Sequence, residues 1–180
     1  MKHTFKLTPS ISREARGFTL IETLVAISVL LVSLAGPLSI AAQALQSAYH
    51  ARNQITAFYL AQEAMEYVRA VRDQNYLAGN PWLTKLDGTG GGNCIDASCA
   101  VDFPNFTHEV CSGVCPFVVI GASSDLFNLA SGDPTIYRRT LEIDTLPGTD
   151  DEVSVTVRVE WRSNRLERSF EIHEQLFDWL

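Results

Sequence analysis

The chain has 180 residues, of which 14 are lysine or arginine and 21 are aspartate or glutamate, for a net charge of −7. The segment 1–17 holds four basic side chains and one acidic one, so the segment 18–180 holds ten basic and twenty acidic side chains. An excess of ten negative charges argues against a general electrostatic attachment to nucleic acid, and we expect no nucleic-acid partner.

The segment 1–17 is short and basic, and it comes directly ahead of an apolar one. An excess of lysine and arginine marks the cytoplasmic side of a membrane-spanning helix. We therefore expect residues 1–17 to lie in the cytoplasm and the part of the chain that follows the apolar segment to lie outside it.

The apolar segment extends from Thr23 to about Ala48. No Asp, Glu, Lys or Arg occurs between Glu22 and Arg52. About 20 apolar residues are enough for a helix to cross a bilayer. Glu22 stands at the start of this segment, where burying a carboxylate costs about 2.5–3.5 kcal/mol. The sequence predicts a cationic partner for Glu22, or else a position near the membrane interface from which its side chain reaches water.

The junction between the two segments, Gly17-Phe18-Thr19-Leu20-Ile21-Glu22, resembles the type IV pilin-like family, which includes type II secretion pseudopilins and competence pilins. The resemblance implies that a prepilin peptidase cuts between Gly17 and Phe18 and methylates the new amino group of Phe18. It also implies that Glu22 pairs with the amino terminus of a neighbouring subunit, since each charge is tolerable in an apolar surrounding only when it is paired.

The same resemblance implies partners and a location. Before assembly, lipid surrounds the helix of a single-pass protein in the cytoplasmic membrane, and afterwards other pilin-like subunits pack against that helix in a filament. An alternative processing site is Ala42-Gln43-Ala44, which a signal peptidase could cut so that everything from Leu45 onward is released. Two features argue against this alternative: the apolar segment is longer than a signal peptide requires, and it contains Glu22.

One helix is predicted from Phe18 to about Arg72, roughly 55 residues or about 80 Å in length. Gly36-Pro37 should bend it, because proline removes a helical hydrogen bond. This pair comes slightly earlier than the helix-kinking proline usual in the family. The second half of the helix is amphipathic, with apolar residues on one face at Leu60, Ala64, Tyr67, Val68 and Val71.

The rest of the chain predicts a loop followed by strands. Residues 73–93 lack periodicity and end in a glycine-rich run, as a surface loop does. Four strands follow, at Phe117–Ile120, Tyr137–Ile143, Val153–Trp161 and Leu166–Leu176, with a turn at Arg162–Arg165. Their short connections favour an antiparallel sheet of three to five strands packed on the amphipathic half of the helix. The predicted fold class is therefore α+β and pilin-like.

Four cysteines lie close together in the sequence, at Cys94, Cys99, Cys111 and Cys115. Outside the cytoplasm such a set favours two disulfides, with three possible pairings that the sequence does not distinguish. A zinc site with four cysteine ligands is the alternative. The favoured interpretation is disulfides and no metal.

No catalytic motif is recognisable. His50, His108 and His173 are isolated from one another, and a disulfide-bonded Cys111 could not act as a nucleophile beside His108. We expect no enzyme activity and no cofactor. The predicted organisation is a leader at residues 1–17, a transmembrane or filament-core helix at 18–48, and an extracytoplasmic part at 49–180.

The sequence thus predicts a structural subunit, minor or accessory, of a type IV pilus or related pseudopilus. The alternatives are a membrane-anchored adhesin or binding module that does not polymerise, and a secreted enzyme with an uncleaved anchor. The sequence does not distinguish a retractile pilus from a secretion or competence pseudopilus.

Overall fold

The structure is a computed structural model that describes residues 17–149, 151–163 and 166–178. Residues 1–16 of the expected leader and residues 164–165 of the expected turn lie outside this described part. The chain divides into two compact units, Met1–Ser47 and Ala48–Leu180, which we treat separately. We call the second unit the head.

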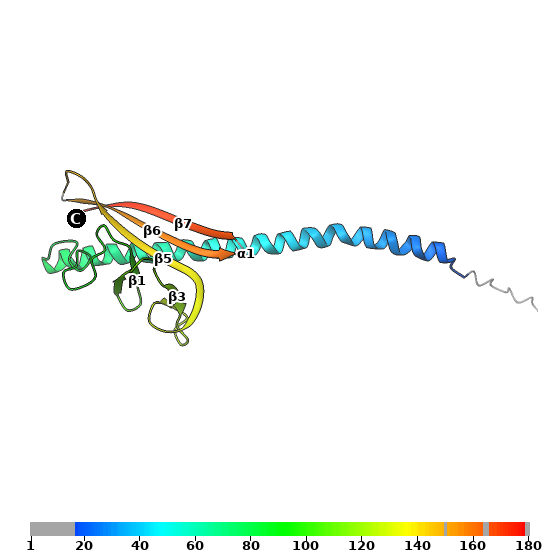
Figure 1. Cartoon of the computed structure of the whole chain (residues 1–180), viewed down its shortest axis with the longest axis horizontal. Coiled ribbons are helices and arrows are strands. Elements are labelled where there is room, and N and C mark those ends of the chain that lie inside the picture. Colours follow the sequence, from blue (N-terminus) through cyan, green and yellow to red (C-terminus); the bar gives the residue numbers. More distant parts are fainter. Residues whose placement is uncertain (1–16, 150, 164–165, 179–180) are drawn as a thin grey trace, which may run out of the picture. The chain divides into compact units, whose positions relative to one another are not determined.

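The described residues form one helix and seven strands (Figure 1). This α+β arrangement, a long N-terminal helix and a C-terminal antiparallel sheet, confirms the fold class predicted from the sequence. The elements are α1 (Leu20–Ala78), β1 (Cys99–Asp102), β2 (Thr107–Val110), β3 (Phe117–Ile120), β4 (Phe127–Asn128), β5 (Asp133–Thr145), β6 (Glu152–Ser163) and β7 (Leu166–Phe177).

The helix α1 ends at Ala78, six residues beyond the predicted Arg72. Its end is a Schellman motif, in which the Asn80 amide donates to the Asn75 carbonyl at 2.9 Å and the Gly79 amide donates to the Tyr76 carbonyl at 3.1 Å. Gly79 adopts the left-handed conformation that this motif requires, with φ of 70°. The apolar stripe stops at Val71, so it gave no signal for this last turn.

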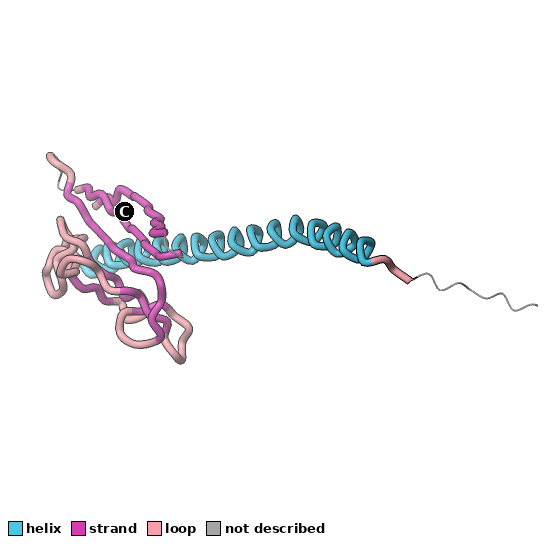
Figure 2. Tube along the Cα trace, turned by 45° about the vertical axis from the view of Figure 1, so that its right-hand side comes forward, coloured by secondary structure: helices cyan, strands magenta, loops and turns pink. Residues whose placement is uncertain are grey.

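Three long strands, β5, β6 and β7, form an antiparallel meander (Figure 2). The second edge of β5 is shared by two short strands, with β3 paired near its start and β1 near its end. β2 pairs with β1, and β4 pairs with β3. The described sheet therefore has seven strands rather than three to five. The three unpredicted strands have at most four residues each, too few for a periodic signal.

The core of the head lies between the amphipathic part of α1 and one face of the sheet. All five residues of the predicted helical stripe are at most 1% exposed. The alternating apolar residues of β6 are buried in the same core: Val153, Val155, Val157, Val159 and Trp161.

Strand β7 alternates in burial from Phe170 onward, but it is more exposed than β6. Leu166 is 60% exposed, and of the apolar residues Phe170, Ile172 and Leu176 only Leu176 is fully buried. β7 pairs with β6 alone and lies at the sheet edge, where less of its inner face is covered.

Candidate processing and assembly site

The candidate site begins at the junction where irregular backbone becomes helix. Gly17, Phe18 and Thr19 are not helical, and Phe18 is 76% exposed. The Thr19 hydroxyl accepts a hydrogen bond from the Glu22 amide at 3.3 Å, and the Thr19 carbonyl accepts the first helical bond, from the Thr23 amide at 3.1 Å. Thr19 is therefore the N-cap of α1.

Glu22 occupies the third position of the helix. Thr19-Leu20-Ile21-Glu22 has the Ser/Thr-x-x-Glu pattern of a capping box, a signal that our sequence analysis missed. The Glu22 carboxylate lies in the first turn, where the helix dipole favours negative charge. It makes no ion pair with any described residue of its own chain.

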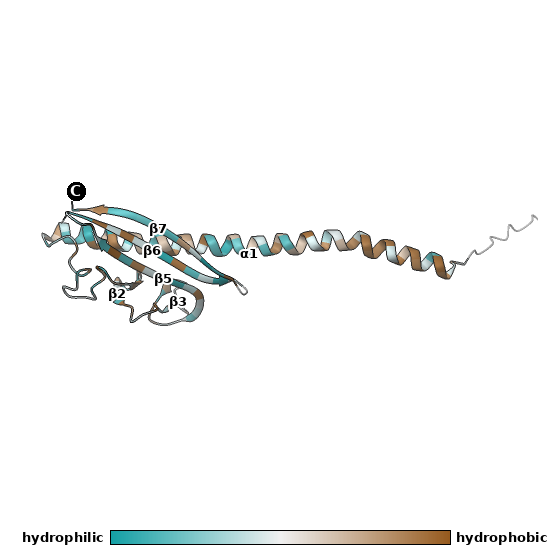
Figure 3. Ribbon diagram, turned by 45° about the horizontal axis from the view of Figure 1, so that its top comes forward, coloured by the Kyte–Doolittle hydropathy of each residue, from teal (hydrophilic) through white to brown (hydrophobic). Residues whose placement is uncertain are grey.

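The segment from Phe18 to Leu45 exposes a largely apolar surface, and its helical part is mostly brown in the view of Figure 3. Fourteen of its large apolar side chains are at least 50% exposed: Phe18, Leu20, Ile21, Leu24, Val25, Ile27, Val29, Leu30, Leu31, Val32, Leu34, Leu38, Ile40 and Leu45. By length and composition α1 could cross a membrane. An apolar surface of this extent requires lipid or protein to cover it.

Four hydroxyl side chains interrupt this surface, and each donates a hydrogen bond within the helix. Thr23, Ser28, Ser33 and Ser39 donate to the carbonyls three residues earlier, each at 2.8 Å. Because each hydroxyl hydrogen is already bonded to a backbone carbonyl, these side chains are compatible with an apolar surrounding.

Comparison with known families decides what this junction is. Residues 12–36 match the family described as the prokaryotic N-terminal methylation motif. The chain carries a type IV prepilin signal. The search of curated proteins and the search of solved structures found no match.

The prepilin signal ends, by this match, at Gly36, directly before Pro37. Both residues lie inside α1, which continues through them. Pro37 has no amide hydrogen to donate to the Ser33 carbonyl, which weakens the ladder at this turn. The bend predicted for Gly36-Pro37 stays a prediction.

Beyond the prepilin signal, the four cysteines form two local disulfides in the head. Cys94 is bonded to Cys99 and Cys111 to Cys115, with Cα–Cα distances of 5.6 and 4.9 Å. All four thiols are thereby used, so the structure has neither the four-cysteine zinc arrangement nor a free Cys111. His108 instead binds the Tyr67 hydroxyl through Nδ1 at 2.7 Å and the Gly92 carbonyl through Nε2 at 2.8 Å.

A buried arginine, which the sequence analysis did not single out, joins three elements of the head. Arg139 of β5 is 1% exposed, and its guanidinium donates to the Glu63 carboxylate at 2.6 Å, to the Leu60 carbonyl at 3.0 Å and to the Val101 carbonyl at 2.6 Å. Burial lowers the pKa of Arg139, and the Glu63 charge opposes that shift. The alternation of Tyr137, Arg139, Leu141 and Ile143 was a signal that placed Arg139 on the inner face.

The head also has an open groove of about 300 Å³ between the start of its helical part and the sheet. Tyr49 and Arg52 of α1 line one side, and Phe127, Ile136 and Tyr137 line the other. The Tyr137 hydroxyl donates to the Asn53 side chain at 3.2 Å. Burial raises the pKa of Tyr137, while the Thr56 hydroxyl and the Arg52 charge act in the opposite direction.

Proposed function

We propose that this chain is a structural subunit, minor or accessory, of a type IV pilus or related pseudopilus. The observation that carries the proposal is the prepilin signal at residues 12–36, followed without interruption by an apolar helix. Proteins with this signal are processed by a prepilin peptidase and assemble with other pilins, and they act as structural subunits rather than enzymes.

In this proposal the peptidase cuts the Gly17–Phe18 bond on the cytoplasmic side and methylates Phe18. Two features support that position for the cut. The Gly17–Phe18 bond lies outside the helix, where a protease can bind it as extended chain. A Cβ added at Gly17 would meet no atom of the described residues within 4 Å, so packing among those residues does not require the glycine.

The mature subunit would then remain in the membrane through residues 18–48 with its head outside the cytoplasm. Assembly would replace lipid with the helices of other subunits around this segment. Glu22 supports the proposal, because its carboxylate lacks an ion pair among the described residues and a neighbour's amino terminus would supply one.

The test is the mature N-terminus, determined by mass spectrometry of protein from the cell envelope. We expect a chain that begins at N-methylated Phe18. Gly17→Val should leave uncleaved precursor in the membrane, because the added side chain obstructs the peptidase and not the fold. Gly36→Val, whose side chain also meets open space, is the matched control and should be cleaved normally.

Three outcomes contradict the proposal. An intact N-terminus in cells with an active prepilin peptidase indicates a permanent anchor, and an N-terminus at Leu45 indicates ordinary secretion. Normal cleavage of Gly17→Val excludes the Gly17–Phe18 bond as the processing site.

A further inference from the structure

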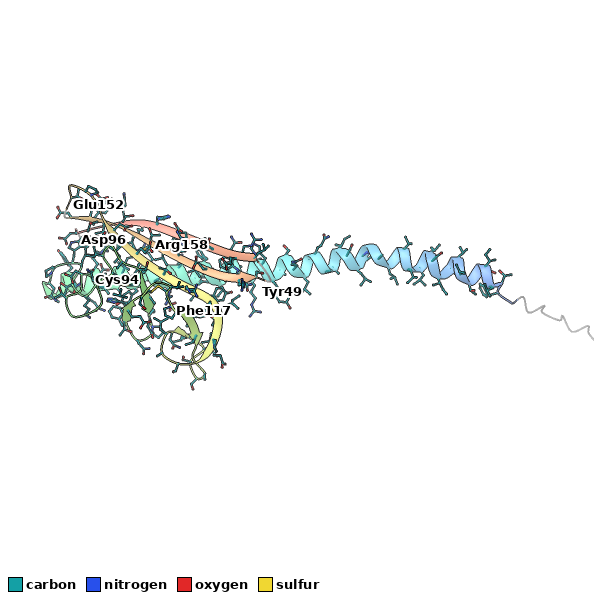
Figure 4. All side chains as sticks on the ribbon, viewed as in Figure 1. Tyr49, Cys94, Asp96, Phe117, Glu152 and Arg158 are labelled. Carbon is teal, nitrogen blue, oxygen red and sulfur yellow. A yellow bond between two sulfur atoms is a disulfide. The ribbon has the colours of Figure 1, made fainter. Side chains whose placement is uncertain are left out.

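The groove lined by Tyr49 and Arg52 lies at one end of the head, and Figure 4 shows Tyr49 at that end with Glu152 at the other. Its walls are mostly apolar, and both are open to solvent, since Tyr49 is 58% exposed and Ile136 is 43% exposed. The hydrogen bond from Tyr137 to Asn53 joins the sheet wall to the helical wall. The head therefore presents a preformed, largely apolar groove of about 300 Å³.

The position of Tyr49 in the sequence relates this groove to the membrane. Tyr49 directly follows the segment 18–48, which spans the membrane in the proposed function. As helix, the chain from Phe18 to Tyr49 is about 46 Å long at about 1.5 Å per residue. A bilayer with its head groups is about 40–45 Å thick. With Phe18 at the cytoplasmic surface, Tyr49 reaches the head-group layer of the opposite face, where tyrosine is enriched.

Two opposite charges flank the groove. Arg52 of α1 lines it, is exposed and makes no ion pair with the described residues. Asp133, at the start of β5, is also exposed and makes no ion pair with the described residues. It precedes the lining residue Pro134 and lies opposite the lining residue Ile120 in the sheet. A cation on the helical side and an anion on the sheet side fit a ligand that carries both charges.

Five other described residues with ionisable side chains lie near this end but do not line the groove: His50, Asp125, Arg162, Glu167 and Arg168. Arg162 and Glu167 pair with each other at 3.8 Å. Arg168 lies opposite Trp161 in the sheet, is exposed and makes no ion pair with the described residues. It therefore serves as a comparison for Arg52.

We propose that the groove binds the head group of a zwitterionic phospholipid, with the lipid phosphate on Arg52 and a primary ammonium group on Asp133. The inference rests on the proposed function, because the segment 18–48 has to hold the subunit in the membrane. The groove is then used by a subunit that waits in the membrane, and it empties when the subunit leaves for a filament. The contact needs no neighbouring copy of the chain, so it suits a minor subunit.

The chemistry of the groove selects among lipids. The guanidinium of Arg52 offers a planar set of N–H donors to phosphate oxygens, and the Asp133 carboxylate accepts hydrogen bonds from an ammonium group. The trimethylammonium of phosphatidylcholine has no hydrogen to donate, and phosphatidylglycerol leaves Asp133 without a cation. The apolar walls suit the glycerol and first methylene groups, which a free head group lacks. We therefore expect a preference for phosphatidylethanolamine.

Photolabelling in nanodiscs tests this preference. The probe is a phosphatidylethanolamine with an unmodified head group and a diazirine high on one acyl chain, and phosphatidylcholine and phosphatidylglycerol with the same chain are the comparison probes. The chain is purified from the cell envelope after its N-terminus has been found at Phe18. Label on peptides that contain residues 49–56 and 134–137 is divided by label on the segment 18–48, which lipid surrounds in any case. This ratio should be about two- to fivefold higher for phosphatidylethanolamine, the range for an exposed charge pair.

Variants without one charge separate the two contacts. Arg52→Gln should lower the ratio for all three probes, because each carries a phosphate. Asp133→Asn should lower it for phosphatidylethanolamine alone, so that the preference disappears. Arg168→Gln and Asp144→Asn remove the same charges from exposed residues outside the groove and should leave the ratios unchanged.

Each other outcome counts against the inference. Equal ratios for the three probes overturn the head-group site, and label confined to the segment 18–48 gives the groove to a protein partner instead. Equal losses for Arg52→Gln and Arg168→Gln indicate only a general attraction between arginine and phosphate. These results overturn the lipid site alone, since the labelled chain begins at Phe18. A chain that begins at Leu45 in the cell overturns the proposed function.

Discussion

Thr19 determines where the helix begins relative to the proposed cleavage site. Its hydroxyl and carbonyl accept the first two hydrogen bonds of α1, so Gly17 and Phe18 remain outside the helix. A peptide bond inside a helix has its backbone groups occupied and is a poor substrate for a protease. Thr19 is thus a positioning residue for processing, separate from the residues that flank the cut.

We predict that Thr19→Val slows cleavage about threefold to tenfold, because an N-cap contributes about 1 kcal/mol to a helix start. Valine has the shape of threonine without its hydroxyl, whereas asparagine is a good N-cap with a different shape. Thr19→Asn should therefore retain most of the cleavage rate, measured as conversion of precursor to mature chain over time. Normal cleavage of the valine variant with slow cleavage of the asparagine variant would mean that the peptidase recognises the shape of the side chain.

Arg139 is the second residue with a large expected effect. Arg139→Met would leave the Glu63 carboxylate and two backbone carbonyls without their donor, so we expect the free energy of unfolding to fall by about 3–5 kcal/mol. Glu63→Gln keeps an oxygen acceptor but leaves the buried guanidinium without the negative charge of its partner, so it should cost a similar amount. Urea unfolding of the full chain in detergent, followed by tryptophan fluorescence, measures both. A loss below about 1 kcal/mol for Glu63→Gln would contradict a stabilising ion pair at this position.

At the scale of elements, Tyr67 links α1 to β2 through His108. Tyr67 is 1% exposed, and burial raises its pKa to about 12. In the unfolded chain a tyrosine ionises near pH 10, so the stability contributed by the protonated phenol is complete below that pH and is lost as the pH rises towards 12.

We therefore predict that the free energy of unfolding falls by about 2–3 kcal/mol between pH 10 and 12 because of this residue. Tyr67→Phe should remove this contribution to the fall in the free energy of unfolding above pH 10. At neutral pH the same change should lower the free energy of unfolding by about 1 kcal/mol, because the hydrogen bond to His108 is lost. Tyr76→Phe, at an exposed tyrosine on the same helix, is the control and should leave the alkaline slope unchanged. Identical slopes for the wild-type chain and Tyr67→Phe would contradict the assignment.

Features whose signal lies in neighbouring residues could be predicted from the sequence, and features that depend on distant segments could not. β6 was clear because five alternating apolar residues face one core, and the Gly17–Glu22 junction was clear because its signal lies in consecutive residues. The extra turn of α1 depends on a cap at Gly79. The cysteines pair between residues five and four positions apart, and their spacing alone did not distinguish these local pairs from the two other possible pairings. Arg139 is buried because three partners from distant segments surround it, and composition does not reveal such partners.

At the scale of the whole molecule, Glu22 should affect assembly and not insertion. Glu22→Ala removes a carboxylate from the apolar segment, so the inserted subunit should be at least as stable as before. In a filament the variant would leave a neighbour's amino group without its partner, at a cost of about 3–5 kcal/mol. We expect normal cleavage and a lower ratio of variant in sheared filaments to variant in the membrane. An unchanged ratio would contradict pairing by Glu22 and would fit an anchored module that does not polymerise.

The four hydroxyls of the apolar segment have a consequence for how subunits find their relative height. Each is already bonded to its own helix, so moving the segment from lipid to protein, or sliding it along a neighbouring helix, exchanges none of their hydrogen bonds. In our proposal, Glu22 is then the polar side chain of this segment whose partner depends on axial position, so the position at which that carboxylate is paired is the one that its charge selects.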